Sequence, residues 1–176
     1  VLAGAVNMDI LAIACPTDEP VIRVKSAGHK QDDIDLTDLS PQQEESTHSA
    51  SLIRGIASDF NRKGRKIGGF TAYTISDVPK GSGLSSSAAF EVLIGSILNH
   101  FYNDGQVSPE EVAITAQFAE NVYFGKPSGL MDQMACSVGN IVQIDFKNPS
   151  APDIRPLSLS PESAGYRLVV VSAGHG

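Results

Sequence analysis

A segment rich in glycine and serine, from Pro79 to Ala89, contains the residue types best suited to chemistry in this sequence. Its glycines, Gly81 and Gly83, permit a tight turn and leave backbone N–H groups accessible, and its serines add hydroxyls. From Ala88 the chain is apolar with helical spacing. The first N–H groups of a helix lack partners within the helix, and its dipole favours negative charge. Such a loop therefore predicts a phosphate-binding site.

The loop by itself is also compatible with a simple helix cap. Two common nucleotide-binding loops do not explain it. The Walker-type loop places lysine directly after its last glycine, whereas Lys80 precedes both glycines, and the spacing of Gly81 and Gly83 is not that of the dinucleotide fingerprint. A further chemical group is needed to choose between a phosphate-binding site and a simple helix cap.

One acidic residue further along the chain, Asp132, is a candidate for that group. Asp132 lies among small and apolar residues such as Met131 and Met134. A carboxylate in such surroundings is costly unless it has partners or a shifted pKa, and such groups concentrate at functional sites. The alternative for Asp132 is an ordinary first-turn residue of a helix. Glu120, judged from its own surroundings, would be a solvated helix residue.

The two segments together resemble the GHMP small-molecule kinases, and among them the galactokinases. Residues Gly81 to Ala89 resemble the phosphate-binding motif of that family. Residues Ala119 to Gln133, with Ala-Glu-Asn followed by Phe-Gly-Lys-Pro-Ser-Gly-Leu-Met-Asp-Gln, resemble the galactokinase segment that carries the catalytic aspartate. The motifs occur in the family's order and at a compatible separation, and the similarity continues through most of the chain.

The resemblance implies a role for each candidate residue. The phosphates of ATP would be bound by Gly81, Ser82, Gly83, Leu84, Ser85, Ser86 and Ser87. Ser87 and Glu120 would be ligands of Mg²⁺, which prefers hard oxygen donors. Asp132 would face the anomeric hydroxyl of D-galactose, as a general base or as an orienting anion, and Gly129 would contact the sugar through its backbone. Ser128 stands where many galactokinases have cysteine, a change between small residues with little expected consequence.

The implied reaction is the transfer of phosphate from ATP to the anomeric hydroxyl of D-galactose, which gives α-D-galactose 1-phosphate. Three alternatives stay open: another GHMP kinase acting on N-acetylgalactosamine, mevalonate or homoserine, a non-catalytic galactose sensor of the same fold, and a domain with a capped helix and no site. The segment Gly129 to Gln133 favours a galactokinase over other kinases, and the intact pair Ser87 and Ala88 favours an enzyme over a sensor.

Composition is ordinary for a globular protein, since 41% of the 176 residues are hydrophobic and 19% are charged. The net charge of −7 argues against nucleic acid as the main partner, because phosphate backbones bind basic surfaces. No apolar run reaches the ~18 residues of a membrane span, so we expect no membrane association and a cytoplasmic location. Cys15 and Cys136 lack metal-ligand spacing and are expected to be free thiols.

The elements that must position these residues follow one another without regular βαβ alternation, which predicts an α+β fold. Alternating or β-branched apolar segments predict strands at 21–26, 70–75, 141–146 and 166–171, and one or two buried strands within 1–14. Helical spacing predicts helices at 47–62, 88–103, 108–123 and 129–139. Residues 15–20 are expected to form a turn, 27–46 an acidic loop and 147–161 a connection. The resemblance refines the fold to that of domain 2 of ribosomal protein S5, with a mixed sheet packed against helices.

Each of the first three helices is expected to bury one apolar face. The expected faces are Leu52, Ile53, Ile56, Ala57 and Phe60 in the first, Ala89, Val92, Leu93, Ser96, Ile97 and Phe101 in the second, and Val112, Thr115, Ala116, Ala119, Val122 and Tyr123 in the third. Ser108, followed by Pro109 and two acidic residues, predicts the start of the third helix.

Domain organisation follows from the resemblance alone. Residues 1–171 are expected to form a GHMP kinase N-terminal domain that is incomplete at its start, and 172–176 to begin a linker to an absent C-terminal domain. Galactokinases have an N-terminal signature with an arginine near the transferred phosphate, and a C-terminal domain that supplies a sugar-contacting tyrosine. Because this sequence contains neither, we expect a fragment with little or no activity of its own.

Overall fold

The computed structural model describes residues 1–79, 82–148, 152–159, 161, 163, 165–167 and 169. Its strands are β1 (Leu2–Gly4), β2 (Ile10–Thr17), β3 (Val21–Ser26), β4 (Gln31–Asp35), β5 (Gly69–Ser76), β6 (Ile141–Asp145) and β7 (Asp153–Leu157). Its α-helices are α1 (Ser49–Arg62), α2 (Ser86–Tyr102), α3 (Pro109–Phe118) and α4 (Met131–Val138). A short 3₁₀ helix, η1 (Gln43–Glu45), precedes α1, and a π-helical turn, η2 (Ala119–Phe124), follows α3.

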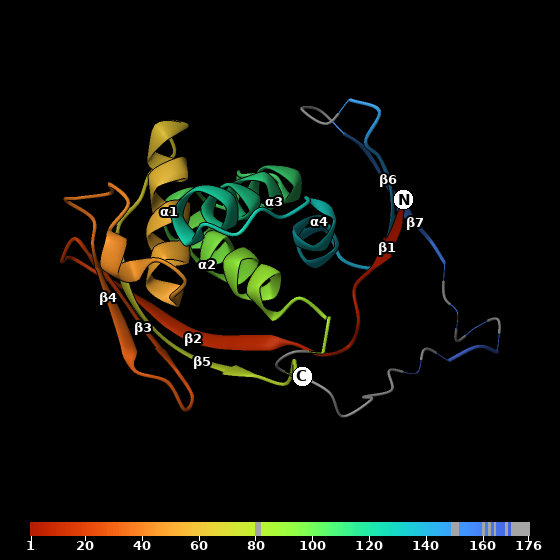
Figure 1. Cartoon of the computed structure of the whole chain (residues 1–176), viewed down its shortest axis with the longest axis horizontal. Helices are drawn as coiled ribbons and strands as arrows, with labels where there is room; N and C mark the ends of the chain where they lie inside the picture. The colour runs from red at the N-terminus through yellow and green to blue at the C-terminus, as the bar shows by residue number, and fades with distance from the viewer. Residues whose placement is uncertain are drawn as a thin grey trace.

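The strands form two sheets. The larger sheet has the order β2-β5-β3-β4, in which β3 and β5 are parallel and the other pairs are antiparallel. The smaller sheet, β1-β6-β7, is antiparallel throughout. In Figure 1 the larger sheet lies along one side of α1 and α2, and the smaller sheet lies beside α4. This mixed sheet packed against helices confirms the predicted α+β fold.

The main core lies between the larger sheet and the helices. The predicted face of α1 is confirmed, because all five of its apolar residues are buried. The inner face of β5 is also buried, since Phe70, Ala72 and Thr74 are each no more than 2% exposed. A second cluster joins α3 and α4 to β6 through Ala113, Leu130, Met134, Val142 and Ile144. The second cluster fixes α4, the helix that carries Asp132, against the smaller sheet.

Three predictions about loops are wrong. Strand β2 continues through Pro16 to Thr17 instead of turning after Ala14; it is an edge strand, where proline is tolerated. Strand β4 lies within the acidic segment expected to be a loop and buries Ile34 against β3. Strand β7 lies within the expected connection and pairs with β6. Pairing with a neighbouring strand outweighs the weak local preference of these segments.

The strands near the N-terminus are not buried as predicted. Leu11 and Ile13 on β2 are 58% and 83% exposed, and their partners on β5, Ile75 and Tyr73, are about half exposed. The helices cover one face of this sheet, and these four side chains stand on the other. The strand predicted at 166–171 lies partly outside the described residues, as does the domain boundary at 171; Tyr166 and Val169 are described and exposed.

The buried faces of α2 and of the helix after it also differ from the prediction. In α2, Glu91 and Gly95 are buried and Ser96 is exposed, because α3 packs against Gly95 and the Ser96 side faces a pocket. The helix that begins at Ser108 changes at Ala119 into the π-helical turn η2, so Glu120 is buried and Val122 is 52% exposed. A π-helical turn has more residues per turn than an α-helix, which shifts the phase of the buried face. The Ser108 cap is confirmed by its hydroxyl, which accepts a hydrogen bond from the Glu111 N–H.

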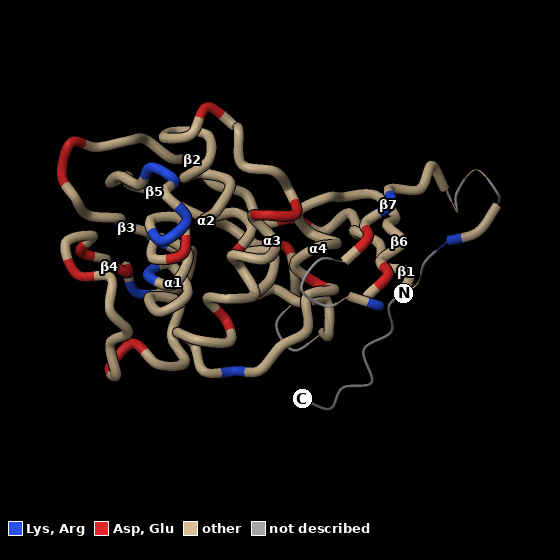
Figure 2. Tube along the Cα trace, turned by 90° about the horizontal axis from the view of Figure 1, so that it is seen from above, with Lys and Arg blue, Asp and Glu red and all other residues tan. Residues whose placement is uncertain are grey.

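Many basic side chains are paired with acidic ones. Arg54 pairs with Glu45 at 2.6 Å, Lys63 with Asp59 at 2.7 Å, and Arg65 with Glu111 at 2.6 Å. Figure 2 accordingly shows blue positions beside red ones around α1. These pairs reduce the positive surface available to a polyanion such as nucleic acid. Within the part of the chain that the structure describes, no helix is both long and apolar enough to cross a membrane.

A Gly55→Ala substitution is expected to lower the free energy of unfolding by about 1–3 kcal/mol, because it overpacks the contact between α1 and η2. A Cβ at residue 55 would lie 2.8 Å from the Ala119 Cβ and 2.9 Å from the Tyr123 ring. Urea unfolding would measure the loss, and Asn61→Ala on the exposed side of α1 is the control. A stability equal to that of the control would show that η2 can move away without cost.

Candidate active site

The predicted phosphate loop forms an open pocket at the start of α2. Gly83 has a φ of 74°, and the Ser82 hydroxyl donates to the Pro79 carbonyl at 2.7 Å, which holds the turn. The pocket has a volume of about 310 Å³. It is lined by Pro79, Ser82, Gly83, Ser85, Ser86, Ser87, Lys126 and Asp132. Gly81 lies outside the described residues.

Ser85 precedes α2 in a strained conformation. Its φ of 57° is unusual for a residue with a side chain and costs on the order of 1 kcal/mol. Its side chain makes no capping hydrogen bond to α2, and its hydroxyl donates instead to Asp132 Oδ2 at 2.7 Å. The loop is therefore linked to the candidate catalytic carboxylate, because its serine is turned toward Asp132.

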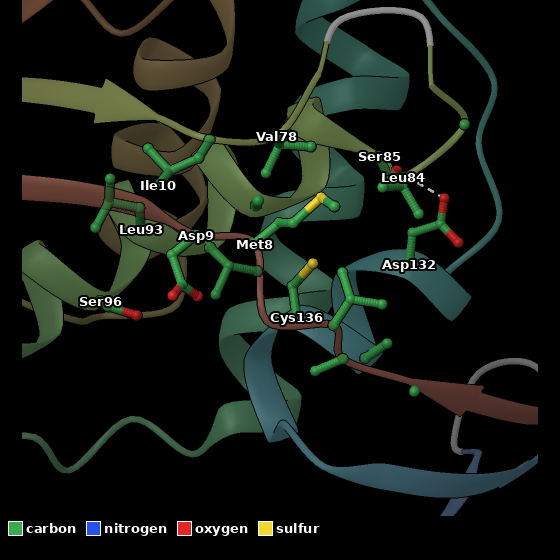
Figure 3. A pocket seen from close by; sticks show the side chains of 17 residues that line it. Met8, Asp9, Ile10, Val78, Leu84, Ser85, Leu93, Ser96, Asp132 and Cys136 are labelled. Carbon is green, nitrogen blue, oxygen red and sulfur yellow. Dashed lines mark hydrogen bonds between the residues drawn. The ribbon is translucent and has the colours of Figure 1, made fainter. Parts of the chain in front are cut away.

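Asp132 borders two pockets at once. It lies in the first turn of α4, where the helix dipole favours a carboxylate, so the structural role predicted as its alternative is also present. Its side chain lines both the phosphate pocket and a larger pocket of about 370 Å³ between α2, α4 and residues 4–10. Figure 3 shows Asp132 at one end of the larger pocket, joined by a hydrogen bond to Ser85. A group bound in one pocket could thus meet a group bound in the other beside Asp132.

Glu120 is buried, so the prediction of a solvated residue from its own surroundings is wrong. Glu120 is 2% exposed. Its Oε1 accepts hydrogen bonds from Lys126 Nζ at 2.9 Å and from the Ser87 hydroxyl at 3.2 Å. Its Oε2 accepts from the Gln133 amide at 2.8 Å. Burial by itself raises the pKa of Glu120, but hydrogen bonds led by the one from Lys126 outweigh it and lower the pKa. Glu120 is therefore a fixed carboxylate anion beside the phosphate pocket.

A second buried carboxylate, Glu91, lies behind Glu120. Gln133 donates to Glu91 Oε2 at 3.2 Å and so links the two acids. Burial, reinforced by the charge of Glu120, raises the pKa of Glu91 to about 8. Glu91 is consequently a neutral carboxylic acid at neutral pH, and its Oε1, like the Gln133 Oε1, has no hydrogen-bond partner among the described residues. Of the two acids beside the pocket, Glu120 is charged and Glu91 holds its proton.

Three residues of this cluster were not predicted as functional. Lys126 belongs to the run Phe-Gly-Lys-Pro, which signals only the end of a helix. Glu91 is a single acid in an otherwise apolar stretch of α2, and such an isolated acid was a signal of burial with partners. Gln133 has no distinguishing pattern of its own. Its role follows from the tertiary contact between α4, α2 and η2.

Two of the predicted site residues lie elsewhere. Leu84 lines the larger pocket and not the phosphate pocket. Gly129 is exposed and lines neither pocket. The adjacent Ser128 is held by Asn121, whose Oδ1 accepts from the Ser128 N–H at 2.6 Å.

Cys136 does not have the features of a nucleophile. Cys15 is exposed and Cys136 lines the larger pocket, and both are free thiols as predicted. Burial, together with the charge of Asp132, raises the pKa of Cys136 to about 11. Its thiol thus stays protonated near neutral pH and contributes bulk to the pocket wall.

Comparison with known proteins places this site in a family. The sequence profile described as the GHMP kinases N terminal domain matches residues 51–140, which contain the phosphate loop, Glu120 and Asp132. The chain belongs to the GHMP kinases. Within that family it is similar to the galactokinase of Streptomyces coelicolor, with 34% identity over 97% of this chain and 44% of the relative.

Solved structures agree on the fold. The galactokinase of Lactococcus lactis, solved in complex with galactose, superposes with a TM-score of 0.77 at 22% identity over 90% of this chain and 42% of its own. A mevalonate kinase superposes with a TM-score of 0.67 at 18% identity, over 89% of this chain and 49% of its own. The chain thus spans less than half the length of these relatives.

Proposed function

We propose that this chain supplies the phosphate-binding and acceptor-orienting half of a galactokinase, which transfers phosphate from ATP to the anomeric hydroxyl of D-galactose and gives α-D-galactose 1-phosphate and ADP. The observation that carries the proposal is the position of Asp132, which borders the phosphate pocket and the larger pocket together. Phosphoryl transfer depends mainly on positioning donor and acceptor in line and on offsetting charge.

The phosphate pocket is the proposed donor site. Its serine hydroxyls and the N-terminal end of α2 suit the phosphates of ATP. Ser85 holds the carboxylate of Asp132 toward the junction of the two pockets. From there Asp132 would accept a hydrogen bond from the acceptor hydroxyl, and would orient this hydroxyl or take its proton as the phosphate is transferred.

The larger pocket is the proposed acceptor site, and its lining favours a neutral sugar. Among the described residues that line it, the polar side chains are those of Asp9, Ser85, Ser96 and Asp132, and none is Lys, Arg or His. An acceptor with a carboxylate, such as mevalonate, would meet two carboxylates without a cation, which is unfavourable. A sugar would find hydrogen-bond partners for its hydroxyls. The galactokinase named among the relatives supports galactose as this sugar.

Ser87 and Glu120 are the proposed protein ligands of Mg²⁺, and their geometry fits this ion. The Ser87 Oγ and Glu120 Oε1 atoms are 3.2 Å apart. Neighbouring oxygen ligands at ~2.1 Å from Mg²⁺ are separated by about 3 Å. The described residues include no group of three or more His, Cys, Asp or Glu arranged for a metal. The phosphates of ATP would therefore complete the coordination, and the bound ion would offset their charge.

Two measurements test the proposal. Calorimetry of the 176-residue chain with ATP and with galactose would measure binding, and formation of galactose 1-phosphate with Mg-ATP would be measured for the chain and for the native protein that carries it. Binding of both ligands, with transfer to galactose but not to mevalonate in the native protein, is the expected result. Binding of both without any transfer would overturn the proposed enzyme and favour a galactose sensor.

A further inference from the structure

Lys126 is brought to the phosphate pocket by the turn that follows α3. Residues 119–124 form η2, and Gly125 then reverses the chain with a φ of 81°. The Lys126 N–H donates to the Glu120 carbonyl at 3.1 Å, and its ammonium reaches the Glu120 carboxylate at 2.9 Å. Glycine is favoured at 125, because it takes the left-handed conformation without strain. The backbone therefore places the Lys126 side chain over Glu120.

Lys126 is the sole cation among the described residues that line this pocket. The pocket also holds Asp132, and Glu120 lies directly behind it. Phosphates bound to the serines would be repelled by these carboxylates, since like charges within a few ångströms cost free energy when partly buried. Lys126 is thus the group best placed among these residues to offset that repulsion.

The two members of the Lys126–Glu120 pair differ in their freedom to move. The Glu120 side chain is 3% exposed and is also held by Ser87 and Gln133. The Lys126 side chain is 61% exposed and has no partner other than Glu120 among the contacts of the described residues. Lysine carries three donors on a flexible stem, so its ammonium can turn to a phosphate oxygen while Glu120 stays in place.

We propose that Lys126 is a phosphate-binding residue, whose ammonium pairs with Glu120 before the nucleotide binds and turns to the terminal phosphates of ATP when it does. This inference rests on the proposed function, because it assigns a further contact in the same donor site. The movement also exposes Glu120 Oε1 beside Ser87, where the proposed Mg²⁺ ligands lie. The Lys126–Glu120 pair thereby offsets the charge of Glu120 in one state, and in the other it frees an ammonium for phosphate and a carboxylate for Mg²⁺.

The test compares the binding of ATP and of AMP to the 176-residue chain by calorimetry. Lys126→Met is expected to weaken ATP binding about 10- to 100-fold, as expected for loss of a charged hydrogen bond, and to leave AMP binding unchanged. Lys126→Arg, which keeps the charge, should retain most of the ATP affinity. Lys30→Met, on the turn between β3 and β4, removes the same charge far from the site and should change neither affinity.

Each further outcome has one meaning. Unchanged ATP binding by Lys126→Met overturns the role of Lys126 and leaves the proposed function intact. An equal loss of ATP and AMP binding, or a loss accompanied by a lower melting temperature, also overturns it, because Lys126 would then act only through the structure of η2. Absence of ATP binding by the unmodified chain overturns the proposed donor site, and the role of Lys126 with it.

Discussion

An Asp132→Asn variant is expected to lose about 10²- to 10⁴-fold in the rate of galactose 1-phosphate formation, the usual contribution of a positioned acid–base group. Asparagine has nearly the same shape and keeps an oxygen that can accept the Ser85 hydroxyl. It lacks the negative charge and cannot take a proton. The loss should therefore fall mainly on kcat, and the KM for ATP should change little.

The measurement is made on the native protein that carries this chain, with Mg-ATP and galactose. Asp33→Asn is the matched control, since it removes an exposed carboxylate on β4 and should leave the rate unchanged. Urea unfolding of both variants should agree with the parent within ~1 kcal/mol, because neither side chain packs in the core. A fully active Asp132→Asn protein would show that Asp132 neither orients nor deprotonates the acceptor.

A Glu91→Gln variant is expected to remove a pH dependence of stability. Glutamate ordinarily titrates at 4.5, and burial raises the pKa of Glu91 in the folded protein to about 8. Between these values the folded chain holds a proton that the unfolded chain releases, so the free energy of unfolding falls as pH rises. The slope is at most about 1.4 kcal/mol per pH unit and levels off above the folded pKa.

Urea unfolding at pH 5, 6.5 and 8 would measure this effect. Between pH 5 and pH 8, the free energy of unfolding of Glu91→Gln is expected to rise by up to about 4 kcal/mol relative to that of the parent. Other carboxylates, such as Asp59 and Glu120, have lowered pKa values and contribute with the opposite sign, but the difference between the two curves isolates Glu91. Glu44→Gln, at an exposed acid of η1, is the control. Parallel curves for parent and variant would mean that Glu91 is ionised in the folded state.

The sequence by itself determined the class of fold and the two segments of the site. The phosphate loop and the Asp132 segment are local runs rich in glycine, serine and small residues. Each run by itself also fits an ordinary helix start, and the resemblance joined the two into one candidate site. The α1 face and the Ser108 cap were also predictable, because helical spacing and capping are properties of consecutive residues. Ser85 and Asp132 are 47 positions apart, and their hydrogen bond could be expected only through the resemblance.

Only the tertiary structure decided how these segments meet. Strands β4 and β7 form because a partner strand satisfies their backbone groups, which no local pattern reveals. The side of α2 that is buried depends on where α1 and α3 pack, since the helix is apolar over most of its surface. The burial of Glu120 and the proton held by Glu91 follow from the meeting of η2, α4 and α2, where Ser87 and Gln133 contact these acids. Whether a buried carboxylate is charged depends on its neighbours in space, and here those neighbours come from α2, η2 and α4.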